Sequence, residues 1–217
     1  MIGGCFMLVA ICGPSGAGKS SLEEELRRQG AKRVVNYTTR DRRPGERNTV
    51  DYNFISKQDY EDMLKENLFC ISEKYSGDRY YGTLKEDIVK LSESKDIYAI
   101  TLTPNGIRAV DALIEDKNNL IKVMVTASLG VRVKRYIDRK GDMEFNFDDM
   151  NEINARVNRD FGMFLNMEDS MDMVLDNTPD HRYGYTGMFS ITNLANQVLL
   201  EAQQRINHIE RADVLER

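Results

Sequence analysis

Residues 13–20 have the sequence GPSGAGKS, which matches the phosphate-binding pattern G-x-x-x-x-G-K-[ST] at every fixed position. The glycines let the backbone curl so that its N–H groups face phosphate oxygens, and a following helix adds the positive end of its dipole. Lys19 can reach the terminal phosphates, and the Ser20 hydroxyl can ligate Mg²⁺. An apolar segment precedes the motif and an amphipathic one follows it, which favours a phosphate loop over a chance glycine turn. The motif therefore predicts ATP or GTP binding by Gly13, Ser15, Gly16, Ala17, Gly18, Lys19, Ser20 and Ser21.

A second group of anion-binding residues lies between residues 32 and 47. This window holds six basic and two acidic residues, a local charge of +4 in a chain of formal net charge −5. Arg40 and Arg43 stand in a turn rich in proline and glycine, and Tyr52 and Tyr81 are further candidates. Arginine binds phosphate with two donors at once, and tyrosine hydroxyls can add hydrogen bonds. The simpler interpretation is a solvated loop, but a phosphate loop with a separate arginine pocket suggests transfer between two phosphorylated molecules.

A third group of arginines has helical spacing. Arg132, Arg135 and Arg139 stand at i, i+3 and i+7, and Arg156 and Arg159 form another i, i+3 pair. Ion pairing at the surface would explain these residues without any function. The functional alternative is a lid that closes over a transferring phosphoryl group, whose charge the arginines would neutralise.

The elements that must position these residues follow from hydrophobic periodicity. Short apolar runs predict strands at residues 6–12, 32–37, 97–102, 120–125 and 174–175, with further short strands within 68–81. Amphipathic spacing predicts helices at residues 20–29, 57–67, 85–94, 107–115, after Ser128, at 150–164 and along 191–209. Alternating strands and helices indicate an α/β fold with a mostly parallel sheet covered on both faces. The polar segments 36–94 and 141–149 are expected to be mobile lobes of this fold.

Composition limits the kind of protein and its partners. The 217 residues are 41% hydrophobic and 30% charged, as expected for one soluble globular domain. The acidic balance argues against a nucleic-acid partner, and the apolar run at 6–12 is too short to span a membrane. No basic residue precedes that run, and three cysteines without a CxxC pattern indicate reduced thiols in a cytoplasmic protein. The apolar stripe of the C-terminal helix fits core packing or a dimer face, so the chain is expected to be a monomer or homodimer.

The order and spacing of five segments resemble the guanylate kinase family of nucleoside monophosphate kinases, over roughly residues 6–180. The segments are 13–22 (GPSGAGKSSL), 37–46 (YTTRDRRPGE), 51–56 (DYNFIS), 80–83 (YYGT) and Asp176-Asn177. The resemblance implies a P-loop core at about 1–35 and 95–217, an NMP-binding lobe at 36–94 and a short lid at 138–152. It also implies transfer of the ATP γ-phosphoryl group to GMP or dGMP, with Mg²⁺ accompanying ATP and small-molecule nucleotides as the partners.

The resemblance also assigns expected roles to individual residues. Lys19, Arg135, Arg139 and Arg156 would be catalytic, and Ser20 would hold Mg²⁺. The residues expected to bind the acceptor are Asn36, Arg40, Arg43, Tyr52, Ile71, Ser72, Tyr81, Thr83, Thr101 and Thr103.

The chain departs from the family pattern where the acceptor base is recognised. The family places a guanine-binding glutamate on the strand before YYG. Counting from 51–52 reaches Ile71, counting back from 80–81 reaches Ser72, and Glu73 lies off both registers. A family D-x-D motif is matched by Thr101 and Thr103, and a serine of the acceptor site by Asn36. We therefore expect weaker discrimination for guanine, because a charged hydrogen bond lost from a buried site costs about 1.5–3 kcal/mol.

Other functions stay open from the sequence. The acceptor could be another nucleoside monophosphate or ribose 1,5-bisphosphate. A catalytically weak guanylate-kinase-like binding module is a second alternative, although such modules have lost the phosphate loop that Lys19 and Ser20 preserve here. An unrelated P-loop switch or ATPase is a third, but no apolar strand ends in the aspartate that such proteins use for Mg²⁺.

Overall fold

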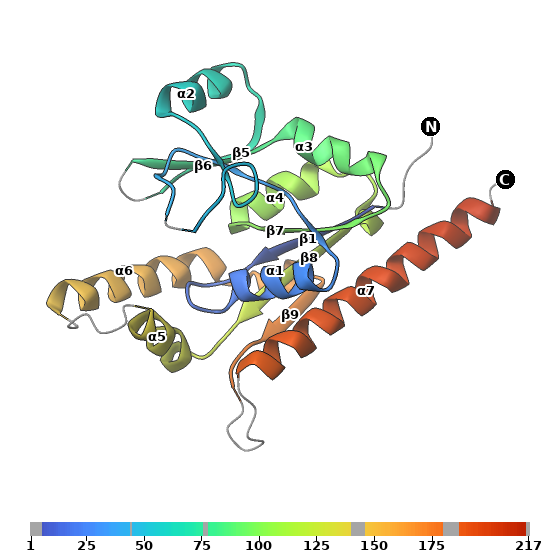
Figure 1. The fold of residues 1–217 in the computed structure, drawn as a ribbon. Coiled ribbons are helices and arrows are strands. Elements are labelled where there is room, and N and C mark those ends of the chain that lie inside the picture. The colour runs from blue at the N-terminus through green and yellow to red at the C-terminus, as the bar shows by residue number, and fades with distance from the viewer. Residues whose placement is uncertain (1–5, 44, 76–77, 140–145, 180–186, 216–217) are drawn as a thin grey trace.

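Five parallel strands form the central sheet of the computed structural model, in the order β2-β7-β1-β8-β9 (Figure 1). These strands are β1 (Met7–Cys12), β2 (Lys32–Arg33), β7 (Ile97–Thr101), β8 (Leu120–Thr126) and β9 (Met173–Asp176). The structure describes residues 6–43, 45–75, 78–139, 146–179 and 187–215. Every strand pairing in this sheet is parallel, which confirms the predicted α/β fold with a mostly parallel sheet.

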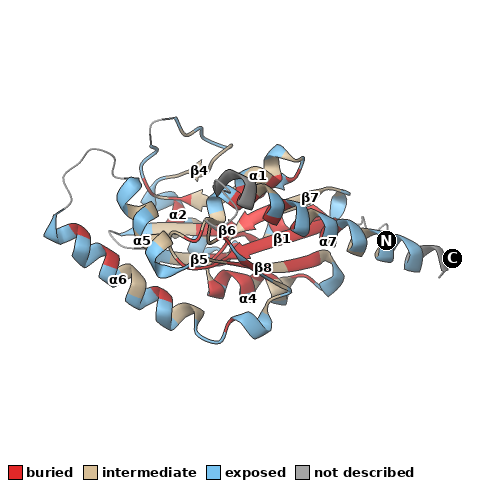
Figure 2. Cartoon of the chain, turned by 90° about the horizontal axis from the view of Figure 1, so that it is seen from below, coloured by how far each residue is buried: buried red, intermediate tan, exposed pale blue. Residues whose placement is uncertain are grey.

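Strand β1 lies in the middle of the central sheet and is buried along its whole length. Val9 and Ile11 point to one face of the sheet, and Leu8 and Ala10 point to the other, as the alternation of a strand requires. Because both faces are covered, the strand has no polar side and forms one continuous apolar run. Figure 2 shows the buried residues concentrated in this strand and in β7 and β8.

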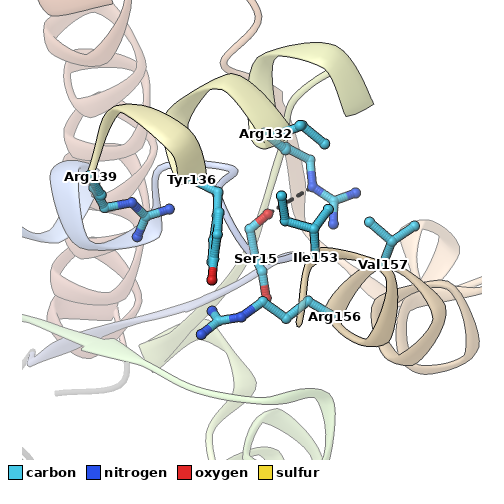
Figure 3. A pocket seen from close by; sticks show the side chains of 9 residues that line it. Ser15, Arg132, Tyr136, Arg139, Ile153, Arg156 and Val157 are labelled. Atoms are coloured by element: carbon cyan, nitrogen blue, oxygen red, sulfur yellow. Dashed lines mark hydrogen bonds between the residues drawn. The ribbon is translucent and has the colours of Figure 1, made fainter. Parts of the chain in front are cut away.

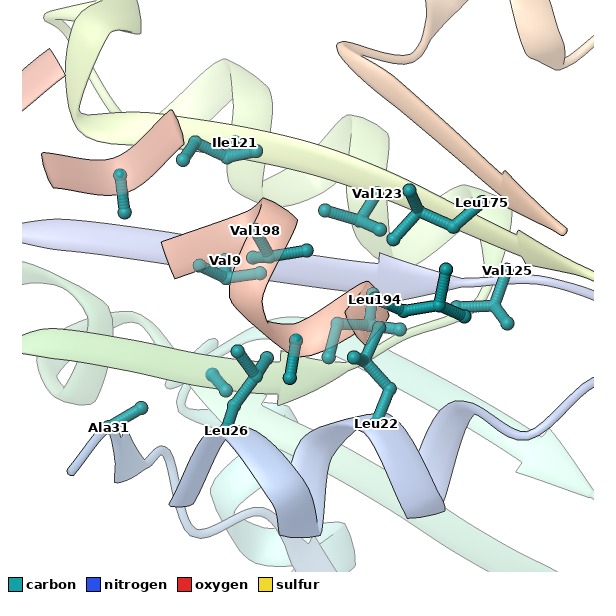
Figure 4. Close-up of a cluster of buried hydrophobic side chains, with 14 of the residues drawn as sticks. Val9, Leu22, Leu26, Ala31, Ile121, Val123, Val125, Leu175, Leu194 and Val198 are labelled. Atoms are coloured by element: carbon teal, nitrogen blue, oxygen red, sulfur yellow. The ribbon is translucent and has the colours of Figure 1, made fainter. Parts of the chain in front are cut away.

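Two helices, α1 (Lys19–Arg28) and α7 (Gly187–Leu215), cover one face of the sheet. Leu22 and Leu26 of α1 pack in the same buried cluster as Val198 of α7 (Figure 4). The predicted core packing of the C-terminal helix is therefore confirmed for Ile191, Leu194, Val198 and Ala202. The C-terminal part of α7 extends beyond the sheet (Figure 1).

The opposite face is covered by α4 (Pro104–Leu113), α3 (Lys85–Val89) and the 3-10 helix η1 (Lys90–Glu93). The sequence predicted one α-helix over 85–94, but the α-helix ends at Val89 and a 3-10 turn continues it. Ile88 and Leu91 are both buried in the cluster on this face. Their i, i+3 spacing suits a 3-10 turn, in which residues three apart eclipse each other.

A second, four-stranded sheet has the order β4-β3-β6-β5. Its strands are β3 (Tyr37–Thr38), β4 (Asn53–Phe54), β5 (Phe69–Tyr75) and β6 (Arg79–Leu84). Helix α2 (Lys57–Lys65) packs on this sheet through the ring of Tyr60, which stacks on Phe69 with 4.5 Å between ring centroids. Tyr60, Phe69 and Leu84 form a small buried cluster, separate from the two clusters of the central sheet.

The strand predicted over residues 32–37 is wrong as a single element. Its first two residues belong to β2 at the edge of the central sheet, while Tyr37 begins β3 of the second sheet. Val34 still donates to the carbonyl of Ala99 in the central sheet, and Asn36 already accepts from Asn53 of β4. The chain therefore crosses between the two sheets within these six residues.

Helices α5 (Leu129–Asp138) and α6 (Phe147–Phe164) carry the arginines of the expected lid. The middle of that lid, residues 140–145, lies outside the described residues. The remaining elements are the short 3-10 helices η2 (Lys117–Asn119) and η3 (Glu168–Ser170). Among the described helices, none combines the length and the apolar character that a membrane span needs.

Candidate active site

The phosphate loop joins the end of β1 to the start of α1, and two of its glycines are required by its shape. Gly13 has φ 142° and Gly18 has φ 109°, both in the region that side chains disfavour. A Cβ on Gly13 would lie 2.0 Å from the carbonyl oxygen of Val125, and one on Gly18 would lie 2.2 Å from Nδ2 of Asn177. The loop thus lies directly against the ends of β8 and β9, which only glycine permits at these positions.

Lys19 folds back over the loop that it follows. Its Nζ donates to the carbonyl oxygens of Gly13 at 2.7 Å and Pro14 at 3.1 Å. Burial lowers the pKa of Lys19 from 10.5 to about 8, and the nearby carboxylate of Asp160 opposes this shift. The ammonium group is therefore held by backbone carbonyls beside the loop, and it remains mostly protonated at neutral pH.

Two cavities meet at Lys19. The larger has a volume of about 810 Å³ and is lined by the phosphate loop, the start of α1 and arginines of α5 and α6. The smaller has a volume of about 220 Å³ and lies between the central sheet and the second sheet. Lys19 lines both cavities, so one cation stands between a site at the phosphate loop and a site beside the second sheet.

The larger cavity brings together most of the residues expected to bind ATP. Its lining includes Ser15, Gly16, Gly18, Lys19, Ser20, Ser21, Arg135, Arg139, Arg156 and Asn177. Gly13 and Ala17 belong to the same loop but are buried and do not line this cavity. Ser20 is the second residue of α1 and is exposed, so its hydroxyl oxygen is accessible from the cavity. A hydroxyl oxygen is a hard ligand of the kind that Mg²⁺ prefers, and the position therefore fits the expected metal contact.

The three lid arginines differ in what they contact. Arg135 donates to the carbonyl oxygens of Gly16, Ala17 and Asn177 at 2.9–3.0 Å, so its guanidinium supports the loop from behind. Burial lowers the pKa of Arg135. Arg139 is exposed at the end of α5, and Arg156 of α6 forms an i, i+4 ion pair with Glu152. The resemblance implied one shared catalytic role for these arginines, whereas their contacts in the structure differ.

The side chains around Ser15 are drawn in Figure 3. Arg139 and Tyr136 project from α5, and Arg156 projects from the facing helix α6. The guanidinium of Arg156 lies over the ring of Tyr136, 5.3 Å from its centroid. Arg139 and Arg156 therefore place positive charge beside Ser15 of the phosphate loop.

Seven residues predicted to bind the acceptor line the smaller cavity. They are Asn36, Tyr52, Ile71, Tyr81, Thr83, Thr101 and Thr103. The hydroxyl of Thr83 donates to Oδ1 of Asn36 at 2.8 Å, so these two polar groups act as one unit. Burial raises the pKa of Tyr52, which keeps its hydroxyl protonated and able to donate.

Arg40 and Arg43 are not among the residues that line the smaller cavity. Arg40 is buried and forms two hydrogen bonds of 2.7 Å with the carboxylate of Glu46, which raises the pKa of the guanidinium. It contacts the cavity wall through Tyr52, whose ring centroid lies 5.2 Å from its guanidinium, and through the side chain of Tyr81. Arg43 is exposed, and its backbone N–H donates to Glu46.

Strand β5 presents Glu73, and not Ser72, to the smaller cavity. Ser72 is exposed on the opposite face of the strand, where its hydroxyl accepts a hydrogen bond of 2.9 Å from Tyr60. Glu73 and Ile71 share the face that lines the cavity, because side chains two apart point the same way. The pairing of β5 with β6 shifts register between Phe69 and Ile71, which lies on the side of Glu73 from which a count starting at residues 51–52 arrives.

Each threonine at the end of β7 holds a carboxylate from another part of the fold. Thr103 donates to Glu73 of β5, and Thr101 donates to Glu23 of α1 at 2.6 Å. Glu23 is buried and also pairs with Nε of Arg33 at 2.8 Å. Two carboxylates therefore reach this region from other elements, although Thr101 and Thr103 stand where the family pattern has acidic residues.

Sequence reasoning missed both carboxylates, but each had a weak local signal. Glu23 follows Leu22 on the inner side of α1 and stands four residues after Lys19, on the same helix face. Glu73 alternates with Ile71 in a strand whose other face is polar. Among the described residues, no group of three His, Cys, Asp or Glu side chains has the geometry to hold a metal ion. Cys12 and Cys70 are free thiols, and Cys5, the third cysteine of the chain, lies outside the described residues.

Comparison with known proteins agrees with this geometry. The Guanylate kinase family model matches residues 7–178. Guanylate kinase of Lactiplantibacillus plantarum is 33% identical over 155 residues, which cover 70% of each chain, and that of Clostridium tetani is 42% identical over 42% of this chain and 44% of its own. The crystal structure of guanylate kinase from Anaplasma phagocytophilum shares the fold with a TM-score of 0.58, at 14% identity, over 94% of this chain and 88% of that one. The chain therefore belongs to the guanylate kinase family of nucleoside monophosphate kinases.

Proposed function

We propose that this chain transfers the γ-phosphoryl group of ATP to the monophosphate of GMP or dGMP, giving GDP or dGDP. The observation that carries the proposal is the position of Lys19, which lines both cavities. During phosphoryl transfer, negative charge moves between the donor and the acceptor. A cation at the junction of the two sites can neutralise that charge. The names of the relatives, all guanylate kinases, support GMP as the first acceptor to test.

The larger cavity would hold ATP. Backbone N–H groups of the loop and the N-terminus of α1 favour phosphate oxygens, and Lys19 supplies a positive charge. Ser20 would be the protein ligand of Mg²⁺, with phosphate oxygens and water completing its coordination. When bound, the metal ion would neutralise phosphate charge.

The smaller cavity would hold the acceptor, with its base near Glu73. Guanine presents two adjacent N–H donors on one edge, N1–H and the N2 amino group, and a carboxylate can accept from both. Adenine presents an acceptor at the corresponding N1 position and would face Glu73 unfavourably. The donor Thr103 and the pair Asn36–Thr83 complete a polar wall around this position.

The acceptor monophosphate would lie toward Lys19, with Tyr52 and Tyr81 as hydrogen-bond donors. Arg40 would act through the ring of Tyr52 or by releasing Glu46, because its guanidinium is engaged with that carboxylate. In this arrangement the second sheet and α2 form the acceptor lobe within residues 36–94, and residues 138–152 form the lid on a core of residues 1–35 and 95–217.

The residues of the chain would supply position and charge, not covalent chemistry. Lys19 would neutralise charge on the transferring group, with Arg139 and Arg156 approaching from α5 and α6. Arg135 would keep the loop in shape through its three carbonyl contacts. Aligning two bound phosphates and neutralising their charge is the main source of catalysis in this reaction class.

The test is acceptor-dependent release of ADP from ATP and Mg²⁺ with a panel of acceptors. The panel contains GMP, dGMP, AMP, CMP, UMP and ribose 1,5-bisphosphate, with ATP alone as the blank. We expect GMP and dGMP to give the highest kcat/KM. A higher value for another acceptor would replace GMP in the proposal, and release of ADP without dependence on any acceptor would contradict it.

A further inference from the structure

Asp160 of α6 holds a buried carboxylate against Ser15, the third residue of the phosphate loop. The residue is 5% exposed. Its Oδ2 accepts a hydrogen bond of 2.8 Å from the backbone N–H of Ser15, and its Oδ1 accepts one of 3.3 Å from the Ser15 hydroxyl. Asp160 thus joins two parts of the chain that are 145 residues apart.

Arg132 of α5 completes this group. Its guanidinium lies 2.5 Å from Oδ2 of Asp160, and its Nε donates to the carbonyl oxygen of Ser15 at 2.8 Å. The N–H, the carbonyl and the hydroxyl of Ser15 are therefore all bound by one ion pair. Helix α5 also packs on the next loop residue, since a Cβ on Gly16 would lie 2.9 Å from the carbonyl oxygen of Arg132.

Helix α6, which carries Asp160, also carries Arg156 one turn earlier. Residues four apart lie on one face of a helix, so anchoring Asp160 also fixes the direction in which Arg156 projects. Arg156 lines the larger cavity, whereas Asp160 is not part of its lining. Asp160 therefore affects the shape of that cavity through the residues that it holds.

We propose that Asp160 is a positioning residue for phosphoryl transfer, which acts through Ser15 and Arg132 to hold the phosphate loop and Arg156 in one arrangement. The inference depends on the proposed phosphoryl transfer for its kinetic consequence, and on the geometry alone for its effect on the loop. An ion pair at this place also keeps two helices and the loop from moving independently.

The position of Asp160 gives the proposal a readout that a purely structural role would not affect. Asp160 holds Ser15 directly and fixes the direction of Arg156 through helix α6, but it does not line the larger cavity. Removing the carboxylate should therefore lower kcat, which depends on the alignment of the transferring group, much more than it weakens the binding of ATP.

The experiment compares Asp160→Asn with the wild type and with Asp169→Asn, a control at an exposed carboxylate outside this group. The first measurement is binding of a fluorescent ATP analogue, which needs no acceptor. The second is kcat and KM for ATP with GMP. For Asp160→Asn we expect kcat to fall about tenfold or more, with the Kd of the analogue and the KM for ATP each changed by less than about threefold. Asp169→Asn should match the wild type.

Two further variants keep the proposal testable if Asp160→Asn folds poorly. Asp160→Glu retains the charge that pairs with Arg132 and should recover part of the kcat that Asp160→Asn loses. Arg132→Lys retains a cation but lacks the fork that reaches both Ser15 and Asp160, so it should also lower kcat. Unchanged kcat in Asp160→Asn would overturn the proposal, as would losses of kcat that are equal in the Asn and Glu variants. Absence of turnover in the wild type would count against the proposed function alone. The effect on the loop would then be measured by hydrogen exchange of the Ser15 amide, which should be faster in Asp160→Asn, and unchanged exchange would overturn the proposal.

Discussion

The hydroxyl of Thr103 donates a hydrogen bond to the carboxylate of Glu73 and accepts one of 3.2 Å from the N–H of Gly106. Thr103 is the N-cap of α4, so its hydroxyl is fixed by the helix that it starts. The N-terminal end of that helix carries partial positive charge, which favours an ionised carboxylate close by. Glu73 is thereby held at the wall of the smaller cavity, on an otherwise apolar face of β5.

Replacing Glu73 by Gln should reduce preference for GMP. The amide cannot accept from both N–H groups of guanine, and we expect a loss of about 1.5–3 kcal/mol, or about one to two decades in kcat/KM for GMP. The value for AMP should change much less. The measurement is kcat/KM for both acceptors in Glu73→Gln and in the control Glu66→Gln at the exposed end of α2. An equal loss for both acceptors would remove Glu73 from base recognition.

The same variant should be more stable than the wild type at neutral pH. Burial raises the pKa of Glu73, and the hydrogen bond from Thr103 only partly opposes this. The folded state therefore binds this proton more tightly than the unfolded chain, and the stability contributed by Glu73 declines as pH rises through its raised pKa. Thermal unfolding should give Glu73→Gln a higher Tm than the wild type at about pH 7.5, with the difference shrinking toward about pH 4. A Tm difference that is constant across this range would contradict the assignment.

Removing the carboxylate partner of Arg40 should destabilise the protein. Glu46→Gln leaves a buried guanidinium without its ion pair, and we expect the free energy of unfolding to fall by about 1–3 kcal/mol at neutral pH. Arg40 holds the pKa of Glu46 at about 2. Because that pKa is depressed, the advantage of the wild type is present above the usual glutamate pKa and disappears as pH falls toward about 2. Denaturant unfolding measures it, and Glu24→Gln at an exposed ion pair with Arg27 should show almost no effect.

Lys19 should set the alkaline limit of catalysis. Its pKa of about 8 places loss of the ammonium form within the range where the enzyme can be assayed. We expect kcat/KM for ATP to fall as pH rises through that value in the wild type. Lys19→Ala should abolish turnover, while Lys19→Arg should keep a small residual rate without this alkaline limb, because arginine stays protonated. Near-normal kcat in Lys19→Ala would contradict the proposed role.

The core of the fold was predictable because its signals are local. The apolar run of β1, the glycines of the loop and the amphipathic helix α1 follow one another without interruption, and each constrains the next. The strand predicted over residues 32–37 failed for the opposite reason. Whether Val34 and Tyr37 share a strand depends on which partner strands they meet, and those partners lie far away in sequence.

The site was predictable where its residues belong to a continuous motif. Gly13–Ser20 needed no tertiary information. Glu23 and Glu73 did, because their contacts with Thr101 and Thr103 join residues 78 and 30 positions apart. The register shift in β5 adds to the difficulty, since it lies between Glu73 and the motif at residues 51–56.

The small buried cluster of Tyr60, Phe69 and Leu84 has a consequence for amide hydrogen exchange. Three residues bury far less apolar surface than the clusters on either side of the central sheet. The backbone amides of β5 and β6 can therefore exchange through local opening, at a lower free energy than those of β1 and β8. A ligand that fills the cavity beside β5 binds only the closed form and slows this exchange in proportion to its affinity. The exchange rates of a few amides around Glu73 therefore report the affinity for the acceptor without a measurement of turnover.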